Sequence, residues 1–186
     1  LRDFECTLGV RCSVLLSGYN LAESNQLAVI GPNGTCGNAS ANVSTQTWGV
    51  IQSQARFRIL ISGRRFGNTY LAINELARFA RFPNKKVWYV APTYRQAKGI
   101  CWVELKDRLQ KHRWIKEINN SDLTVTLRNN SRISLRGADN EQSLRGVGLD
   151  FLCIDEFADI SPNAWYEVLR PTLSDTQGHA IFCGTP

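Results

Sequence analysis

The stretch "ISGRRFGNTYLA", residues 61–72, decides the fold class. A short apolar run leads into a turn with glycine at positions 63 and 67, and a helix-forming run begins at Thr69. Glycine lets the backbone turn so tightly that its N–H groups point at phosphate oxygens, and a helix N-terminus favours anions. The spacing follows the phosphate-loop pattern G-x-x-x-x-G-K-[ST], except that Ser62 replaces the first glycine and Asn68 replaces the lysine.

The sequence around this loop alternates between strand and helix patterns from about Trp48 onward. Buried strands are predicted at 57–62, 86–91, 149–154 and 180–183, helices at 69–82, 94–112 and 161–173, and a β-hairpin at 122–137. This order predicts an α/β fold, with a mainly parallel sheet that carries helices on both faces.

The first 46 residues have a different composition, rich in Gly, Ser, Asn, Thr and Ala. The run "GPNGTCGNASANVSTQT" has neither a helical nor a strand period and predicts irregular structure. We therefore divide the chain into an irregular N-terminal arm of unknown role, residues 1–46, and one domain, residues 47–186.

Charge is unevenly distributed along the chain, whose formal net charge is +6. Residues 56–136 hold 18 Lys or Arg against 5 Asp or Glu, whereas the remainder holds 4 against 11. A basic stretch of this size suits nucleic acid, although a solvated helix face gives the same pattern. The basic residues that lie on or beside one predicted helix are Arg95, Lys98, Lys106, Arg108, Lys111 and Arg113.

Cysteine spacing and hydropathy argue against a zinc-binding protein and against a membrane protein. The six cysteines form no C-x-x-C pair, which favours reduced, structural thiols in a cytosolic setting over a zinc site. No run approaches the roughly 18 apolar residues that a membrane-spanning helix needs, so no membrane association is expected.

An acidic pair ends the third predicted strand, in "FLCIDEFAD". A carboxylate at the carboxyl end of a buried strand, here Asp155, is well placed to reach a bound Mg²⁺. The next carboxylate, Glu156, can polarise an attacking water. The last strand ends in Gly184 and Thr185, where residues that sense a nucleotide commonly lie.

Several separated segments resemble the ATPase domain of the large terminase subunit of tailed bacteriophages. They are "ARFRILISGRRFGNTYLA", "VWYVAPTYRQAKGICW", "SLRGVGLDFLCIDEFAD", "WYEVLRPTLSD" and "FCGTP", and together they extend over about residues 46–186. The resemblance implies a RecA-like P-loop ATPase core that uses ATP and Mg²⁺. That family continues into a ribonuclease H-like nuclease domain, so we expect this chain to be a motor-domain fragment that is incomplete at its C-terminus.

The resemblance also implies roles for individual residues. The Walker A loop, which binds the nucleotide, is implied at Ser62, Gly63, Arg64, Arg65, Phe66, Gly67, Asn68 and Thr69. Arg64 matches the arginine of this loop that lies near the phosphates, and we count it as catalytic together with Glu156. Thr69 and Asp155 match the magnesium-binding residues, and Gly184 and Thr185 match the coupling motif. Gln46 is the candidate for adenine contact, with Gln52 as the alternative.

The implied function is to drive double-stranded DNA into a capsid by ATP hydrolysis. The implied partners are DNA, the portal protein, the small terminase subunit and further copies in a ring. The implied location is the host cytoplasm at the procapsid portal, and not the mature virion. Asn68 departs from the family's lysine and predicts an impaired site. Two alternatives stay open, namely a helicase-like DNA translocase and a non-hydrolysing remnant that binds DNA or the portal.

Overall fold

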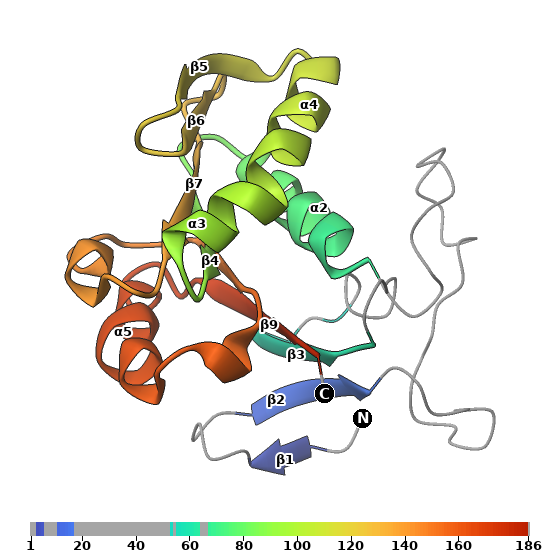
Figure 1. Ribbon diagram of the computed structural model, residues 1–186, viewed down its shortest axis with the longest axis vertical. Helices are drawn as coiled ribbons and strands as arrows, with labels where there is room; N and C mark the ends of the chain where they lie inside the picture. The colour runs from blue at the N-terminus through green and yellow to red at the C-terminus, as the bar shows by residue number, and fades with distance from the viewer. Residues whose placement is uncertain (1–2, 6–10, 17–52, 54, 64–66, 186) are drawn as a thin grey trace.

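The computed structural model describes residues 3–5, 11–16, 53, 55–63 and 67–185 (Figure 1). In chain order the strands are β1 (Asp3–Glu5), β2 (Arg11–Leu16), β3 (Phe57–Ile61), β4 (Lys86–Ala91), β5 (Ile115–Asn119), β6 (Thr124–Leu127), β7 (Arg132–Gly137), β8 (Phe151–Ile154) and β9 (His179–Gly184). The helical segments are α2 (Asn68–Ala80), α3 (Tyr94–Ala97), η1 (Lys98–Trp102), α4 (Val103–Lys111), η2 (Glu141–Leu144), η3 (Phe157–Asp159), η4 (Ala164–Leu169) and α5 (Arg170–Thr172).

The described strands form one sheet in the order β1-β2-β3-β9-β8-β4-β7-β6-β5. The six strands from β2 to β7 in this order are parallel, and β1, β6 and β5 pair antiparallel with their neighbours. In register, Ile61 pairs with Gly184, and Ile154 pairs with Phe182 and Val90. The loops that follow β3, β9, β8 and β4 therefore leave the sheet at one edge.

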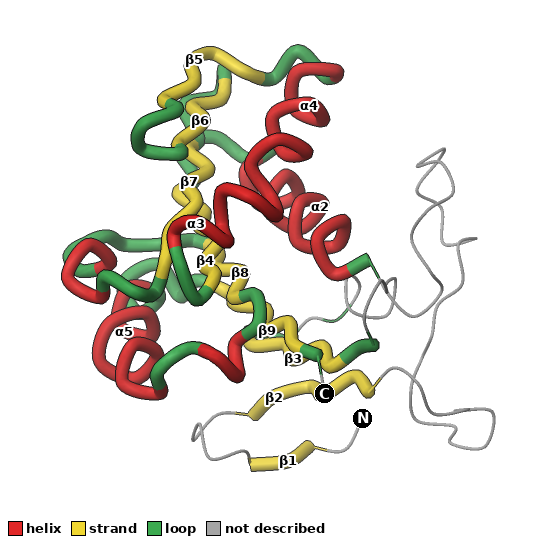
Figure 2. Tube along the Cα trace, in the orientation of Figure 1, coloured by secondary structure: helices red, strands yellow, loops and turns green. Residues whose placement is uncertain are grey.

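Helices cover both faces of the central strands (Figure 2). On one face α2 and the η1–α4 segment pack on residues such as Tyr89, Phe151 and Cys153. On the other face η4 packs on residues such as Leu152 and Ile154. Alternate side chains of β8 thus enter two separate cores, as expected for a parallel strand that is buried on both sides. The predicted α/β architecture is confirmed.

The start of α2 follows from its sequence. Gly67 precedes the helix with φ of 99°, a conformation that residues with a Cβ rarely adopt. Leu71, Leu76 and Ala80 then recur at helical spacing and are buried. At the far end, the side-chain amide of Asn129 donates hydrogen bonds to the carbonyl groups of residues 80–82. Both ends of the helix are therefore fixed.

The predicted helix at 94–112 is interrupted by a wider turn. Thr93 caps its start by accepting a hydrogen bond from the Gln96 N–H group, with the Gln96 side chain reaching back in a capping box. Residues Lys98–Trp102 then form a π-helical turn, and both Cys101 and Trp102 are buried.

The β-hairpin that the sequence predicts at 122–137 is confirmed, since β6 and β7 pair antiparallel there.

Two parts of the strand assignment differ from the sequence prediction. Strand β5 is absent from that prediction, because it is an edge strand whose residues 116–119 are all exposed and give no apolar alternation. The prediction of irregular structure over 1–46 is wrong at Asp3–Glu5 and Arg11–Leu16, which are paired strands. The division into an arm and a domain stays a prediction.

Candidate functional site

The phosphate-loop candidate connects β3 to α2. The Ser62 N–H group donates to the Gly184 carbonyl (3.1 Å), so the first loop residue is held against the end of β9. Ser62 is buried and Gly63 is exposed. Residues Arg64, Arg65 and Phe66 lie outside the described residues, as do Gln46 and Gln52.

Asn68 is held by the loop itself. The Ser62 hydroxyl donates a hydrogen bond to Asn68 Oδ1 (2.6 Å), which links the first loop residue to the first helical residue. Within the described ranges, Asn68 Nδ2 donates to no protein acceptor, so a neutral N–H donor is left at the position where the family carries a lysine. Thr69 follows in the first turn of α2 and is half-buried.

The acidic pair follows β8, which is separated from β3 and its loop by the single strand β9. Asp155 follows β8, and its N–H group donates to the Val90 carbonyl (2.8 Å). Its carboxylate is 6% exposed and accepts two hydrogen bonds, from the Tyr89 hydroxyl (2.5 Å) and from the Glu156 N–H group (3.1 Å). The sheet therefore holds this carboxylate in one orientation.

The pKa shifts follow from this burial. Burial raises the pKa of the Asp155 carboxyl above its ordinary value, and the hydrogen bond from Tyr89 opposes that rise. Burial, and next the charge of Asp155, raise the pKa of the Tyr89 hydroxyl far above its ordinary value. Tyr89 therefore stays protonated and acts only as a donor to Asp155.

Glu156 and Thr185 are in contact. Glu156 has φ of 45°, a left-handed conformation that is uncommon for a residue with a side chain, and it is half-buried. The Thr185 hydroxyl donates to Glu156 Oε2 (3.1 Å). Gly184 closes β9 next to the Phe157 ring, which a Cβ at this position would meet at 3.3 Å. The predicted coupling residues thus contact the predicted catalytic carboxylate and the residue after it.

The donors at this edge suit a hard divalent cation. Mg²⁺ prefers oxygen ligands and keeps several waters, so one carboxylate and one hydroxyl suffice from the protein. Asp155, directly after β8, and Thr69, in the first turn of α2, offer these two groups near the carboxyl ends of β8 and β3. Among the described residues, no group of three His, Cys, Asp or Glu could enclose a metal.

One residue of the site is missed by the sequence prediction. Tyr89 belongs to a strand that the prediction places correctly, but its hydroxyl contact with Asp155 depends on the register of β4 against β8, where Tyr89 pairs with Cys153. Alternation in "KVWYVAP" indicates only that Tyr89 shares a face with Val87. No signal in the sequence identifies its partner.

The described part of the chain holds three free cysteines and no helix that could span a membrane. Cys101, Cys153 and Cys183, the cysteines within the described ranges, are free and buried. Burial raises the pKa of the Cys101 thiol, which keeps it protonated. Among the residues that the structure describes, no helix is both long enough and apolar enough to cross a bilayer.

Comparisons with known proteins agree on one family. Residues 59–183 match the family model described as terminase large subunit, T4likevirus-type, N-terminal. The large terminase subunit of Thermus phage G20c is 33% identical over 157 residues, which cover 74% of this chain and 32% of that protein. The subunit from Escherichia phage T5 is 33% identical over 134 residues, 70% of this chain and 30% of that one. The chain thus spans about a third of the length of these curated relatives.

Solved structures show the same fold. The large terminase ATPase domain of Thermus phage P74-26 superposes with a TM-score of 0.68 at 26% identity, covering 81% of this chain and 66% of that one. The large terminase of a thermophilic bacteriophage, solved in complex with ATP-gamma-S, gives a TM-score of 0.56 at 18% identity, over 68% of this chain and 32% of that one.

Proposed function

Because the chain belongs to the family of T4-type terminase large subunits, we propose that it is the ATP-hydrolysing motor domain of a DNA-packaging terminase. The observation that carries this proposal is the set of side chains at one edge of the sheet. The loop from Ser62 to Thr69, the pair Asp155–Glu156 and Thr185 follow β3, β8 and β9, which are neighbours in the sheet.

The proposed roles follow from chemistry and position. The N–H groups at the start of α2 bind phosphate oxygens, and the Thr69 hydroxyl and Asp155 hold Mg²⁺. When bound, Mg²⁺ neutralises charge that develops between the β- and γ-phosphates. Glu156 accepts a proton from the attacking water. Thr185 donates to Glu156 before reaction, so a nucleotide that recruits either group changes the contact between β9 and the loop after β8.

The residues outside the described ranges complete the proposal. Arg64 acts near the phosphates, with Arg65 and Phe66 in the same loop, and Gln46 contacts adenine. Part of the basic excess between residues 56 and 136 binds double-stranded DNA through its phosphates. The active assembly is a ring of copies that engages the portal protein and the small terminase subunit at the procapsid in the host cytoplasm.

Asn68 favours a second candidate, a remnant that binds DNA or the portal without hydrolysing ATP. A neutral amide replaces the charge-assisted contact of a lysine, and a contact of that kind is worth about 1.5 to 3 kcal/mol. The side-chain carbonyl oxygen of Asn68 already accepts a hydrogen bond from the Ser62 hydroxyl. The relatives described above are terminases, which favours either form of packaging protein over a helicase-like translocase.

Isothermal titration with a non-hydrolysable ATP analogue and Mg²⁺ tests the proposal. We expect weak binding to the unmodified chain and tighter binding to Asn68→Lys, where a gain of 2 kcal/mol corresponds to about 30-fold in affinity. The control Asn68→Lys/Glu156→Gln should keep this affinity and lose hydrolysis, because only the water-activating carboxylate is removed. Absence of binding in both the unmodified chain and Asn68→Lys would refute the nucleotide site. Unchanged affinity in Asn68→Lys, together with loss of binding in Arg64→Ala, would show that an arginine has taken the lysine's role.

A further inference from the structure

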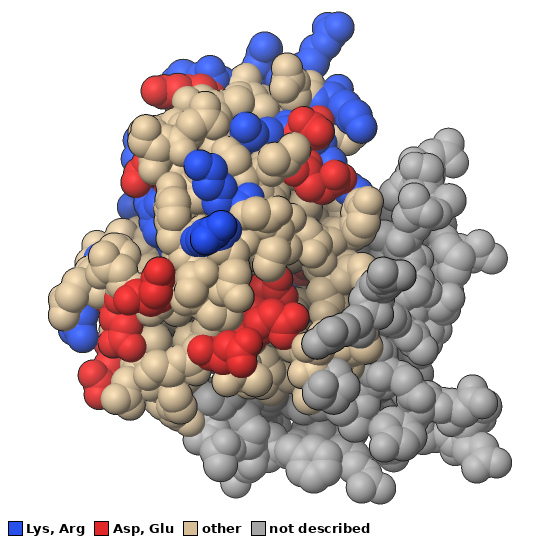
Figure 3. All heavy atoms as spheres, viewed as in Figure 1, with Lys and Arg blue, Asp and Glu red and all other residues tan. Residues whose placement is uncertain are grey.

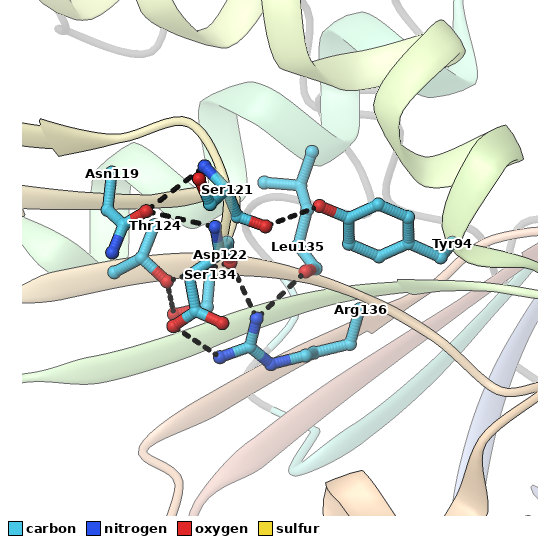
Figure 4. Close-up of polar contacts among 8 residues, drawn as sticks. All are labelled: Tyr94, Asn119, Ser121, Asp122, Thr124, Ser134, Leu135 and Arg136. Atoms are coloured by element: carbon cyan, nitrogen blue, oxygen red, sulfur yellow. Dashed lines mark hydrogen bonds and ion pairs between the residues drawn. The ribbon is translucent and has the colours of Figure 1, made fainter.

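Several basic side chains of the chain form ion pairs with carboxylates, one buried and two at the surface. Arg58 forms an ion pair with Glu75 (2.5 Å), and Arg108 forms one with Glu104 (2.7 Å). Arg136 donates to the Asp122 carbonyl (2.7 Å) and faces the Asp122 carboxylate, which ties the β5–β6 turn to β7 (Figure 4). These arginines already have carboxylate partners, so they are poor candidates for binding DNA phosphates.

One pocket gathers arginines without such partners. It has a volume of about 290 Å³ and is lined by Arg81, Arg113, Trp114, Leu127, Arg128 and Asn129. None of its three guanidinium groups contacts a carboxylate within the described part of the chain, and no Asp or Glu lines the pocket. Three positive charges around one cavity repel one another, so the arrangement favours an anionic occupant.

The backbone under these arginines is fixed. Asn129 donates hydrogen bonds to the carbonyl groups of residues 80–82 (2.8, 2.9 and 3.1 Å), at the end of α2. The Arg128 N–H group donates to the Trp114 carbonyl (2.9 Å), and Arg113 is held with φ of 56° by an N–H donation to the Gln110 carbonyl (2.9 Å). Asn129 thus donates to the carbonyl of Ala80, the last residue of α2, and to those of the two residues after the helix, which reduces the negative potential that this helix end presents to the pocket.

The pocket is separate from the candidate nucleotide site. It lies at the turn between β6 and β7. This turn leads into the amino end of β7, which lies beside the amino end of β4, and the Arg132 N–H group there donates to the Lys85 carbonyl. The nucleotide site lies at the opposite, carboxyl ends of the parallel strands. On the face shown in Figure 3, many Lys and Arg lie over the upper part of the molecule, around α4 and β5, with some Asp and Glu among them, and the lower part carries mainly Asp and Glu.

We propose that this pocket binds backbone phosphates of duplex DNA, an inference that rests on the proposed function because it takes DNA as the partner. Guanidinium groups match phosphate oxygens with two parallel N–H donors, and three arginines are among the residues that line the cavity. Trp114, whose side chain is 36% exposed, and the buried Leu127 give the pocket an apolar wall against which a deoxyribose packs.

The test compares two triple variants of the 186-residue chain that remove the same charge. The first is Arg81→Gln/Arg113→Gln/Arg128→Gln. The second, Arg95→Gln/Lys98→Gln/Lys111→Gln, removes exposed basic groups of the α3–α4 segment that have no carboxylate partner among the described residues. Binding of a short labelled duplex is measured by fluorescence anisotropy over a salt series, and binding of a fluorescent ATP analogue is measured in parallel.

The pocket variant should lower the slope of log K against log salt by about 0.9 for each phosphate that is no longer neutralised, or about 2.7 for three. Over a fourfold rise in salt, the affinity of the unmodified chain should then fall about 40-fold further than that of the variant. The α3–α4 variant should keep most of the slope. Trp114→Ala should weaken DNA binding without changing the slope, since no charge is removed, and thermal unfolding identifies variants that fail to fold.

Equal reductions of the slope in the two triple variants would overturn the pocket as a distinct site while leaving DNA as a partner. Absence of DNA binding in the unmodified chain would overturn both the pocket and the proposed partner. Calorimetry with inorganic pyrophosphate, without Mg²⁺, tests whether the pocket binds a small phosphate anion and not the DNA backbone. Tight binding of pyrophosphate that only the pocket variant abolishes, with DNA affinity unchanged, would assign the pocket to a small anion and overturn the proposal. The pocket variant should bind the ATP analogue as the unmodified chain does, which would show that its loss of DNA binding does not arise from the nucleotide site.

Discussion

Replacing Tyr89 by phenylalanine removes one hydroxyl from the centre of the molecule and leaves the ring in place. Tyr89 is fully buried, and its hydroxyl donates to the buried Asp155 carboxylate at 2.5 Å. A hydrogen bond to a charged group contributes about 1.5 to 3 kcal/mol net, and its removal leaves Asp155 with the Glu156 N–H group as its remaining donor among the described residues. We therefore expect Tyr89→Phe to lower the free energy of unfolding by about 2 kcal/mol.

Urea unfolding followed by circular dichroism measures this change. At a slope of about 2 kcal/mol per molar urea, the expected change moves the midpoint down by about 1 M. The matched control is Tyr70→Phe, which removes a hydroxyl from a side chain that is 44% exposed and whose ring lies under Arg108. Surface substitutions of this kind change stability by no more than about 0.5 kcal/mol.

The same substitution should affect the nucleotide site in a specific way. Without the Tyr89 hydroxyl, Asp155 is held by the Glu156 N–H group and is less firmly oriented. Binding of an ATP analogue should therefore weaken in the presence of Mg²⁺ and stay unchanged in EDTA. A general loss of structure would weaken both. Equal midpoints for Tyr89→Phe and Tyr70→Phe would refute the energetic argument, and equal weakening with Mg²⁺ and with EDTA would refute the orienting role of Tyr89.

Three further predictions concern the frame around the site. Glu75→Ala removes the carboxylate that pairs with the buried Arg58 and should cost about 3 to 5 kcal/mol in unfolding free energy. Arg58→Met/Glu75→Leu should restore much of this loss in calorimetry, and no recovery would contradict the ion-pair argument. The pKa of His179 lies below its ordinary value of 6.5, first because of burial and then because of the Arg58 charge. The unfolded state therefore binds more protons, and stability should fall as pH drops from about 6.5 towards the lowered pKa; His179→Gln should flatten that part of the plot of melting temperature against pH. Gly137→Ala places a Cβ 2.1 Å from the Tyr94 nitrogen and should destabilise by at least about 1 to 3 kcal/mol, whereas Gly99→Ala, a helical position with open space, should stabilise by about 0.5 to 1 kcal/mol in thermal unfolding.

The parts of the fold that the sequence predicts are those with a strong local pattern. "FLCI" is apolar at every position because Phe151 and Cys153 enter one core while Leu152 and Ile154 enter the other. A continuous apolar run of strand length is typical of a parallel strand buried on both faces. Strand β5 has the opposite character, since residues 116–119 are exposed and contribute little to either core. An exposed edge strand is specified by its pairing with β6, and pairing cannot be seen in a single sequence.

The same distinction applies to the site. Asp155, Glu156 and Thr185 can be placed together from the sequence, because each follows an apolar run and the carboxyl ends of parallel strands meet at one edge. The contacts that fix them cannot be predicted, since Tyr89 reaches Asp155 through the register of two strands that are far apart in the chain. The roles of Arg64, Arg65, Phe66 and Gln46 stay predictions, because these residues lie outside the described ranges.

Two unfavourable features lie at the edge of the sheet where the nucleotide is proposed to bind. Asp155 is a carboxylate whose burial raises its pKa, and Glu156 has a backbone conformation that side chains disfavour. Neither feature is favourable by itself. The Tyr89 hydroxyl and the Glu156 N–H group hold the Asp155 carboxylate, and the Thr185 hydroxyl donates to Glu156. A cation beside Asp155 would offset the cost of burying the carboxylate charge. A ligand that binds only the folded state stabilises that state, and the size of this effect depends on the ratio of ligand concentration to Kd. Occupancy of the site and stability of the sheet edge are therefore linked. For the proposed hydrolysis, the hydrogen bond between Thr185 and Glu156 is the contact that would connect this site to the end of β9.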